Sequence, residues 1–185
     1  MNVPSVLMIL CVAGCTAHPA VDVRPGVTRS PAAEDDGIAV YFSPNGGAMA
    51  AVIAEIGKAR ESVDVQAYLI TSADFVEALK AAVARGVRVR VILDANGFGG
   101  AYSAYAFFAG GTVPVWRDGQ HKDAHDKVVL LDGRTLVTGS LNFTDQSDAV
   151  NAENLLVIRD KPTLVAAYLR NFENHLAHAS PFVKP

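Results

Sequence analysis

From residue 38 onward, segments with the two-residue period of a strand alternate with segments that have the period of a helix. Strands are predicted at 38–42, 63–69 and 87–94, with helices at 49–60 and between Thr71 and Gly86. Thr71 and Asp74 have the spacing of a capping box, and Gly86 is expected to end the second helix. This strand–helix–strand order favours a sheet with helices on its faces and parallel neighbouring strands.

The rest of the chain predicts further strands at 113–116, 127–131, 136–139 and 154–158, and a closing helix that begins at Pro162. With 185 residues, 50% of them hydrophobic, the chain is long enough to bury a core and too apolar for a disordered protein. No apolar run reaches the roughly 18 residues of a membrane-spanning helix. We therefore expect a single α/β domain over residues 38–185, with a mixed, largely parallel sheet flanked by helices.

The N-terminal segment has the composition of a secretory leader. Its first 14 residues have no charged side chain, and the apolar stretch 6–12 is followed by small residues and Cys15. We predict a signal peptide at 1–14, with a buried N-terminal helix as the alternative. Val-Ala-Gly before Cys15 resembles the lipobox of bacterial lipoproteins, which implies cleavage before Cys15 and its acylation.

Residues 15–37 are rich in proline and small polar residues and are expected to form a flexible linker or tether. These features predict a periplasmic or lipid-anchored protein of the bacterial cell envelope. Both cysteines of the chain, Cys11 and Cys15, precede the domain, so the domain itself cannot form a disulfide or a thiolate metal site.

Residues 125–142 carry the side chains that are best suited to catalysis. His125 and Lys127 are two residues apart on a predicted strand and should share a face. Ser140 and Asn142 have the same spacing just after Gly139, whose missing side chain allows another group to approach closely. A nucleophile or base, a fixed cation and neutral donors suit a phosphate group, because imidazole can attack while ammonium and amide stabilise the developing charge.

Two carboxylates accompany this set. Glu153 could accept a hydrogen bond from Nδ1 of His125 and leave Nε2 free to attack. Asp132 has the opposite strand parity from His125 and should not touch the same phosphate. The competing interpretations are a hydrogen-bonded core histidine for His125 and an ordinary turn at 139–140.

The pattern His-x-Lys-x-x-x-x-Asp at 125–132, followed by Gly-Ser-x-Asn at 139–142, resembles the signature of the phospholipase D superfamily. The spacing to Glu153 is most similar to that of its small bacterial endonucleases, and the resemblance extends over most of residues 38–178. It implies a phospholipase D-like fold and metal-independent hydrolysis of phosphodiesters, with no cofactor. It also implies roles for individual residues: a phosphohistidine on His125, phosphate binding by Lys127, Ser140 and Asn142, orientation of His125 by Glu153, and a structural or outer position for the motif acid Asp132.

The number of motifs bears on assembly. Such a reaction needs one imidazole to attack and a second to protonate the leaving oxygen. No other histidine of this chain is followed by lysine two residues later. Superfamily members with a single motif resemble half-sites, so we expect a homodimer whose active site lies across the twofold interface.

His121, four residues before His125, raises the alternative of a helical metal pair, but no glutamate stands beside it as in zinc proteases, and we expect no metal there. The glycine-rich stretch 96–100 lacks the Gly-Lys-Ser/Thr of a P-loop and is expected to be a turn.

Net charge is −3, so a generic basic nucleic-acid coat is excluded and any positive charge must be local. Candidates for that charge are Lys122, Lys127, Arg117, Arg88 and Arg90, although the last two also fit a solvated strand face. We expect cleavage of DNA or RNA without sequence preference, since no base-reading element is recognisable. The alternatives are a phospholipase D acting on lipid headgroups and a non-catalytic envelope lipoprotein.

Overall fold

The computed structural model describes residues 30–96, 108 and 110–182. Along the chain the elements are β1 (Ala33–Asp35), β2 (Ile38–Ser43), α1 (Ala48–Lys58), β3 (Ser62–Ala67), α2 (Ala73–Ala84), β4 (Arg88–Asp94), β5 (Val115–Asp118), β6 (Lys127–Leu131), β7 (Thr135–Gly139), α4 (Asp145–Ala149), β8 (Glu153–Arg159), α5 (Pro162–His178) and β9 (Ser180–Pro181). The predicted signal peptide, Cys15, most of the linker and residues 97–100 of the glycine-rich stretch lie outside the described residues. Within these residues no helix is long and apolar enough to cross a membrane.

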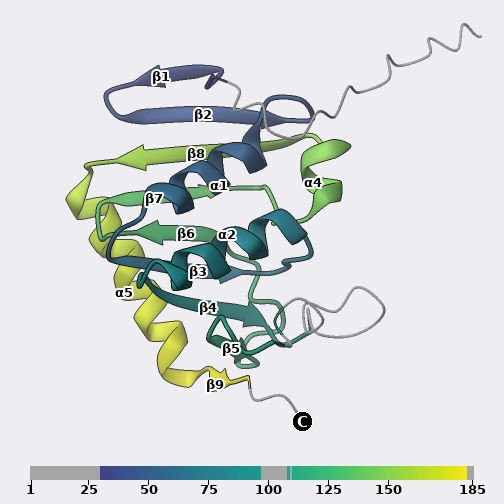
Figure 1. Ribbon diagram of the computed structural model, residues 1–185, viewed down its shortest axis with the longest axis vertical. Helices are drawn as coiled ribbons and strands as arrows, with labels where there is room; N and C mark the ends of the chain where they lie inside the picture. Colours follow the sequence, from purple (N-terminus) through teal and green to yellow (C-terminus); the bar gives the residue numbers. More distant parts are fainter. Residues whose placement is uncertain (1–29, 97–107, 109, 183–185) are drawn as a thin grey trace, which may run out of the picture.

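The strands of the described residues form one sheet, in the order β1-β2-β8-β7-β6-β3-β4-β5-β9 (Figure 1). The expected single domain with a mixed sheet flanked by helices is confirmed. The expectation that the sheet is largely parallel is wrong, because among these strands only β3–β4 and β4–β5 pair in parallel. The second half of the chain runs through close reversals such as the β6–β7 hairpin, and a hairpin makes its two strands antiparallel.

Helices cover both faces of the sheet. Helices α1 and α2 lie on one face and α5 crosses the other (Figure 1). Strand β6 is buried throughout and alternates between the two cores: Val129 and Leu131 belong to the core under α1 and α2, and Val128 and Leu130 to the core under α5. The sheet is therefore a rigid layer whose strand ends can hold functional side chains in fixed places.

Two local predictions change in the structure. The capping box at Thr71 and Asp74 is not formed; α2 begins after Ser72, which makes no side-chain cap, and the backbone N–H groups of Thr71 and Ser72 both bond to the carbonyl of Phe143. Tertiary pairing thus replaces the local cap. The strand expected at 113–116 is shifted to β5, two residues later. Gly86 follows α2 with φ of 83°, as expected for a glycine that ends a helix.

Candidate active site

The predicted site residues come from strands that meet at one end of the sheet, on the right in Figure 1. Lys127 begins β6 and pairs with Ala67 at the end of β3. Gly139 ends β7 and pairs with Leu155, next to Glu153 at the start of β8. Because each strand is fixed by its neighbours on both sides, these positions are held by the whole sheet.

His125 and Lys127 touch, as their spacing predicts. Nζ of Lys127 lies 2.7 Å from the carbonyl oxygen of His125 and 2.9 Å from its Nδ1. An ammonium group can only donate, so Nδ1 accepts and the ring proton lies on Nε2. The His125 side chain is exposed to solvent, whereas Lys127 is 8% exposed.

The environment of Lys127 is a balance between burial and nearby acids. Burial lowers the pKa of the Lys127 ammonium, and the carboxylates of Asp126 and Glu153 oppose this shift. A nearly buried cation beside an exposed imidazole is a suitable partner for a phosphate anion.

Tyr68 is a site residue that the sequence did not reveal. Its ring centroid lies 4.3 Å from that of His125, and Nζ of Lys127 lies 5.1 Å from the Tyr68 ring centroid. The Tyr68 backbone N–H bonds to the carbonyl of Asp126 at 2.8 Å. Tyr68 follows the last residue of β3, and its position at a strand end was the one signal that could have indicated it.

Ser140 and Glu153 form a hydrogen-bonded group beside this pair. Ser140 Oγ donates to Glu153 Oε2 at 2.5 Å and accepts from the backbone N–H of Asn154 at 3.1 Å. Asn151 Nδ2 donates to the other carboxylate oxygen of Glu153 at 3.1 Å. The expected hydrogen bond from Nδ1 of His125 to Glu153 is not formed within this chain, because Nδ1 faces Lys127 instead.

Gly139 allows β7 and β8 to approach closely at this point. A Cβ atom on Gly139 would lie 2.2 Å from the carbonyl oxygen of Asn154 and 3.0 Å from Cα of Leu155. The close approach expected at Gly139 is confirmed, and the group that approaches is the backbone of β8.

Asn142 follows β7 and is half-buried. Its Oδ1 is buried without a hydrogen-bond partner, while the next residue, Phe143, is fixed by a backbone bond to Leu69 at 3.2 Å. A buried polar atom without a partner costs free energy. Only the Nδ2 group of Asn142 can donate to a phosphate oxygen, since Oδ1 is an acceptor.

Asp132 lies at the opposite end of β6 from His125. Its carboxylate accepts the backbone N–H groups of Arg60, Glu61 and Ser62 at 2.8–3.2 Å. Burial acts to raise the pKa of Asp132, but these N–H groups lower it overall. The structure thus separates Asp132 from the catalytic candidates and gives it a structural contact, which ties the α1–β3 turn to the β6–β7 hairpin.

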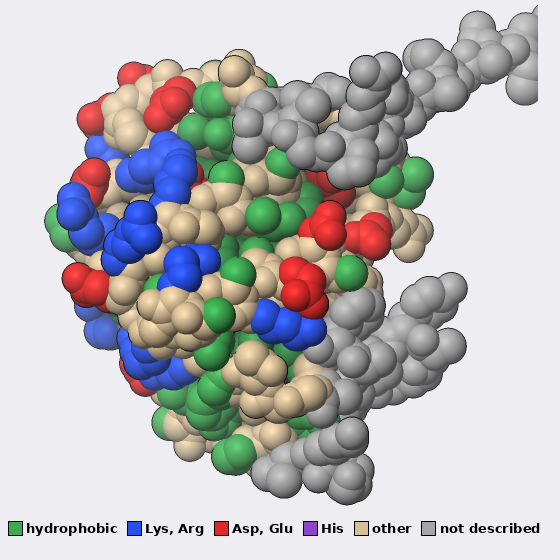
Figure 2. Space-filling model, in the orientation of Figure 1, with side chains coloured by type: hydrophobic (Ala, Val, Ile, Leu, Met, Phe, Trp, Pro, Cys, Tyr) green, Lys and Arg blue, Asp and Glu red, His purple; other side chains and the backbone are tan. Residues whose placement is uncertain are grey.

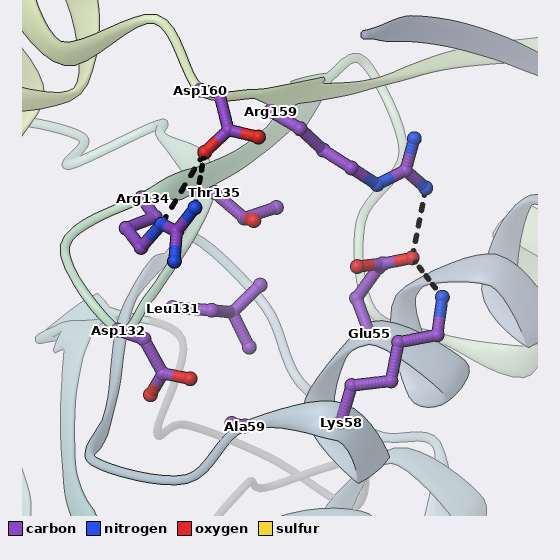
Figure 3. A pocket seen from close by; sticks show the side chains of 9 residues that line it. All are labelled: Glu55, Lys58, Ala59, Leu131, Asp132, Arg134, Thr135, Arg159 and Asp160. Carbon is purple, nitrogen blue, oxygen red and sulfur yellow. Dashed lines mark hydrogen bonds and ion pairs between the residues drawn. The ribbon is translucent and has the colours of Figure 1, made fainter.

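A polar pocket lies at the same end as Asp132 (Figure 3). Its charged groups are satisfied by one another: Glu55 binds Arg159 at 2.9 Å and Lys58 at 2.7 Å, and Arg134 binds Asp160 at 2.9 Å. This pocket is an ion-pair network at the far end of the sheet from His125, and it contributes no group to that site.

Two arginines proposed for the substrate site lie elsewhere. Arg90 binds the buried carboxylate of Asp64 at 2.7 and 3.0 Å and also Glu173 at 2.7 Å, and Arg88 lies 3.5 Å from Asp64. Both stand at the start of β4, whereas the site lies at the strand's other end. Arg90 is therefore neither a substrate contact nor part of a purely solvated strand face, the two interpretations offered by the sequence. It is an ion-pair residue under α5.

Figure 2 shows that most Lys and Arg side chains of the face that carries α1 and α2 lie on its left, interspersed with Asp and Glu side chains, which also occur on its right. The left side is the end at which both helices finish. Of the proposed basic residues, Lys127, Lys122 and Arg117 stand at the right-hand, His125 end of the sheet.

The loop 119–126 that carries His125 is fixed by hydrogen bonds. Asp94, at the end of β4, accepts the backbone N–H of Ala124 at 2.7 Å. Gln66 Nε2 donates to Asp126 at 2.8 Å. His121, in the same loop, does not pair with His125. Its ring stacks 4.9 Å from that of His175, in the group of described residues that could hold a metal ion: Asp118, His121, His175 and His178.

Comparison with known proteins agrees with this geometry. Residues 52–176 match the family model described as "Cardiolipin synthase, PLD-like domain". The chain is 36% identical over 140 residues to a phospholipase D of Rickettsia conorii, covering 76% of this chain and 70% of that protein. It is 32% identical over 116 residues to a mitochondrial cardiolipin hydrolase of Xenopus tropicalis, covering 63% and 55%.

Among solved structures, the phospholipase D family member Nuc from Salmonella typhimurium superposes with a TM-score of 0.76 and 33% identity, covering 80% of this chain and 98% of that one. NucT from Helicobacter pylori shares the fold, with a TM-score of 0.70, 23% identity and coverage of 78% and 98%. The fold is thus that of the phospholipase D family. The chain belongs to the phospholipase D superfamily and is a phosphodiester hydrolase.

Proposed function

We propose that this hydrolase cuts DNA and RNA without sequence preference, through a phosphohistidine intermediate on His125. The observation that carries the proposal is an exposed imidazole in contact with a nearly buried lysine. The match to Nuc over 98% of that chain supports a minimal domain with an open site, which suits a polymeric substrate.

In the proposed reaction, Nε2 of one His125 forms a bond to phosphorus as the bond to the leaving oxygen breaks. His125 of a second copy, present as the imidazolium, gives its Nε2 proton to that oxygen and becomes neutral. Water then attacks phosphorus and gives a proton to the second imidazole, and the P–N bond breaks. Lys127 and Asn142 stabilise the non-bridging oxygens, supported by Ser140.

The contact between Lys127 and Nδ1 places the single ring proton on Nε2, so neither copy of His125 has its catalytic role before substrate binds. In the copy that donates, Nδ1 must first take up a second proton, because a neutral imidazole that gave up its only proton would become an imidazolate. In the attacking copy, the phosphate draws Lys127 away from Nδ1, and the ring proton moves to Nδ1. Glu153 is the carboxylate proposed to accept that proton's hydrogen bond and orient the ring.

A homodimer would supply the second imidazole. Phe42 and Val150 are 50% and 65% exposed. They adjoin Ser43 and Asn151, which bond to each other at 2.9 Å, and the Ser43 hydroxyl accepts the backbone N–H of Glu153 at 3.2 Å. An apolar surface directly beside the site is where a twofold contact would bring two copies of His125 together.

Hydrolysis of phospholipid headgroups is the second candidate. The relatives named phospholipase D and mitochondrial cardiolipin hydrolase favour it, as does the position of Phe42 and Val150, which could contact lipid.

The proposed cellular place is the bacterial envelope, with the leader 1–14 cleaved and Cys15 acylated. Labelling of cells with a fatty-acid analogue tests this. Label should enter the protein and be lost in Cys15→Ser, and an unlabelled wild-type protein would contradict the anchor.

One assay separates the two substrates. Purified protein is incubated with plasmid, RNA and phosphatidylcholine vesicles, without added divalent cation. We expect nicked plasmid and degraded RNA, with activity reduced at least about 10³-fold in His125→Asn and Lys127→Met. Lys58→Met, which changes an exposed lysine at the other end of the molecule, should leave activity unchanged. Release of choline with intact nucleic acid would establish the lipid reaction instead.

A further inference from the structure

Three imidazoles surround one buried carboxylate at the edge of the sheet, away from the proposed chemistry. Asp118 ends β5 and is 0% exposed. Its Oδ2 lies 2.6 Å from Nδ1 of His175 and 3.2 Å from Nε2 of His178, both in the last turn of α5. Nδ1 of His121, from the loop after β5, lies 3.3 Å from both carboxylate oxygens.

The four side chains converge on one point. One ligand atom from each lies within 4.8 Å of the others, and the three ring centroids are 4.9–5.4 Å apart. Imidazole nitrogen and carboxylate oxygen are common ligands of Zn²⁺, at about 2.0–2.2 Å in a tetrahedral shell.

Hydrogen bonding alone explains this arrangement poorly. Nε2 of His178 is buried and has no hydrogen-bond partner, although it lies 3.2 Å from Asp118. Such a buried nitrogen is unfavourable unless something binds its lone pair or its proton.

We propose that one Zn²⁺ ion binds between Asp118, His121, His175 and His178. Four protein ligands close a tetrahedral shell, which makes the site structural rather than catalytic. The ion would join the end of β5, the end of α5 and the loop 119–126. The ligands of the ion include neither His125 nor Lys127, so the ion takes no part in phosphoryl transfer. It instead fixes the loop from which His125 projects.

The sequence contains the corresponding pattern: Asp118-x-x-His121 and His175-x-x-His178 are two pairs with the short spacing typical of zinc ligands. From sequence, the metal pair considered was His121 with His125, which are close in the chain. The pair 118/121 and the pair 175/178 are more than 50 residues apart, and only the fold brings them together.

Elemental analysis of the purified full chain tests the proposal. We expect about one zinc per chain, and on removal and replacement by Co²⁺ the visible spectrum of a tetrahedral cobalt site. His121→Gln and His175→Ala should weaken zinc binding at least about 100-fold. His125→Asn is the matched control, since it removes an imidazole from the same part of the chain and should keep its zinc.

Thermal unfolding provides the readout that does not depend on activity. For the metal-free wild-type chain, Zn²⁺ at 100 times its Kd should raise Tm by about 5–10 °C, and His121→Gln should abolish the shift. His121 is the most exposed ligand, so this variant should fold. The proposal would be overturned if the protein were purified without zinc, if zinc addition did not shift Tm, and if added cobalt kept the spectrum of the hydrated ion. The four residues would then form a hydrogen-bonded histidine cluster only.

Discussion

Lys127 holds a positive charge in a place that water hardly reaches. Because its pKa is lower in the folded chain than in the unfolded chain, the unfolded chain binds more protons between those two values. Stability should therefore rise with pH through that window, which means that the charge costs stability below it. The same low exposure strengthens its attraction for a phosphate oxygen, so folding stability is exchanged for substrate binding.

Asp132 provides the opposite case at the residue scale, a motif acid whose role is structural. We expect Asp132→Ala to lower the free energy of unfolding by about 1–3 kcal/mol, because three backbone N–H groups lose their acceptor. Asp132→Asn should cost less, since asparagine keeps an acceptor and tolerates the φ of 51° at this position. Urea unfolding and turnover per folded molecule check both variants.

The lowered pKa of Asp132 adds a pH dependence. Its stabilising contribution is complete above the usual carboxyl pKa and is lost as pH falls through the lower folded-state pKa. The difference in stability between wild type and Asp132→Asn should therefore shrink on acidification. A variant that folds normally but no longer turns over substrate would instead place Asp132 in the reaction.

At the residue scale, the sequence predicts contacts between residues that are close in the chain. It misses contacts that depend on the register in which two strands pair. The two-residue spacing of His125 and Lys127 predicted their contact correctly. The partner of Glu153 could not be read from spacing, because Ser140 reaches it through the register of β7 on β8. Tyr68 carries no motif and enters the site through the end of β3.

At the scale of elements, β7 and β8 must lie unusually close for the site to form. We expect Gly139→Ala to destabilise the chain by about 1–3 kcal/mol and to reduce activity, because a Cβ would strike the carbonyl of Asn154 and displace Ser140 and Glu153.

The control is Gly57→Ala in α1, where an added Cβ meets nothing within 4 Å. It should raise stability by about 0.5–1 kcal/mol and leave activity unchanged. Thermal denaturation compares the two glycines, and equal effects would show that close approach is not what Gly139 provides.

The spacing of apolar residues predicts the long helices and strands well, because each of them buries apolar side chains at a regular interval. Alternation identified β3 and β4, and the helical stripe after Pro162 identified α5. The short strands β1 and β9 were missed, since each exists only through pairing with an edge strand. The proportion of parallel pairing was overestimated because strand direction depends on where the hairpins place β7 and β8.

At the scale of the whole molecule, assembly decides whether the site has both of its imidazoles. We expect Phe42→Asp to convert a dimer to a monomer and to lower kcat/KM at least about 10²-fold, as burying a carboxylate in an interface is costly and the proton donor would be lost. Light scattering after size exclusion and a turnover assay measure the two effects.

Leu164→Asp is the matched control. Leu164 is 39% exposed but lies at the start of α5, at the far end of the sheet. This variant should remain dimeric and active. Full activity from a strictly monomeric wild-type chain would contradict the shared site.

The position of β9 has a practical consequence. The chain leaves α5 beside His178, runs along β5 and is held there by the bond between Phe182 N–H and the Val115 carbonyl at 2.7 Å. A polyhistidine tag fused directly after Pro185 would offer competing imidazoles to the same ion. A nickel resin could also exchange its own metal into the cluster. Metal content is therefore best measured on untagged protein prepared by ion exchange.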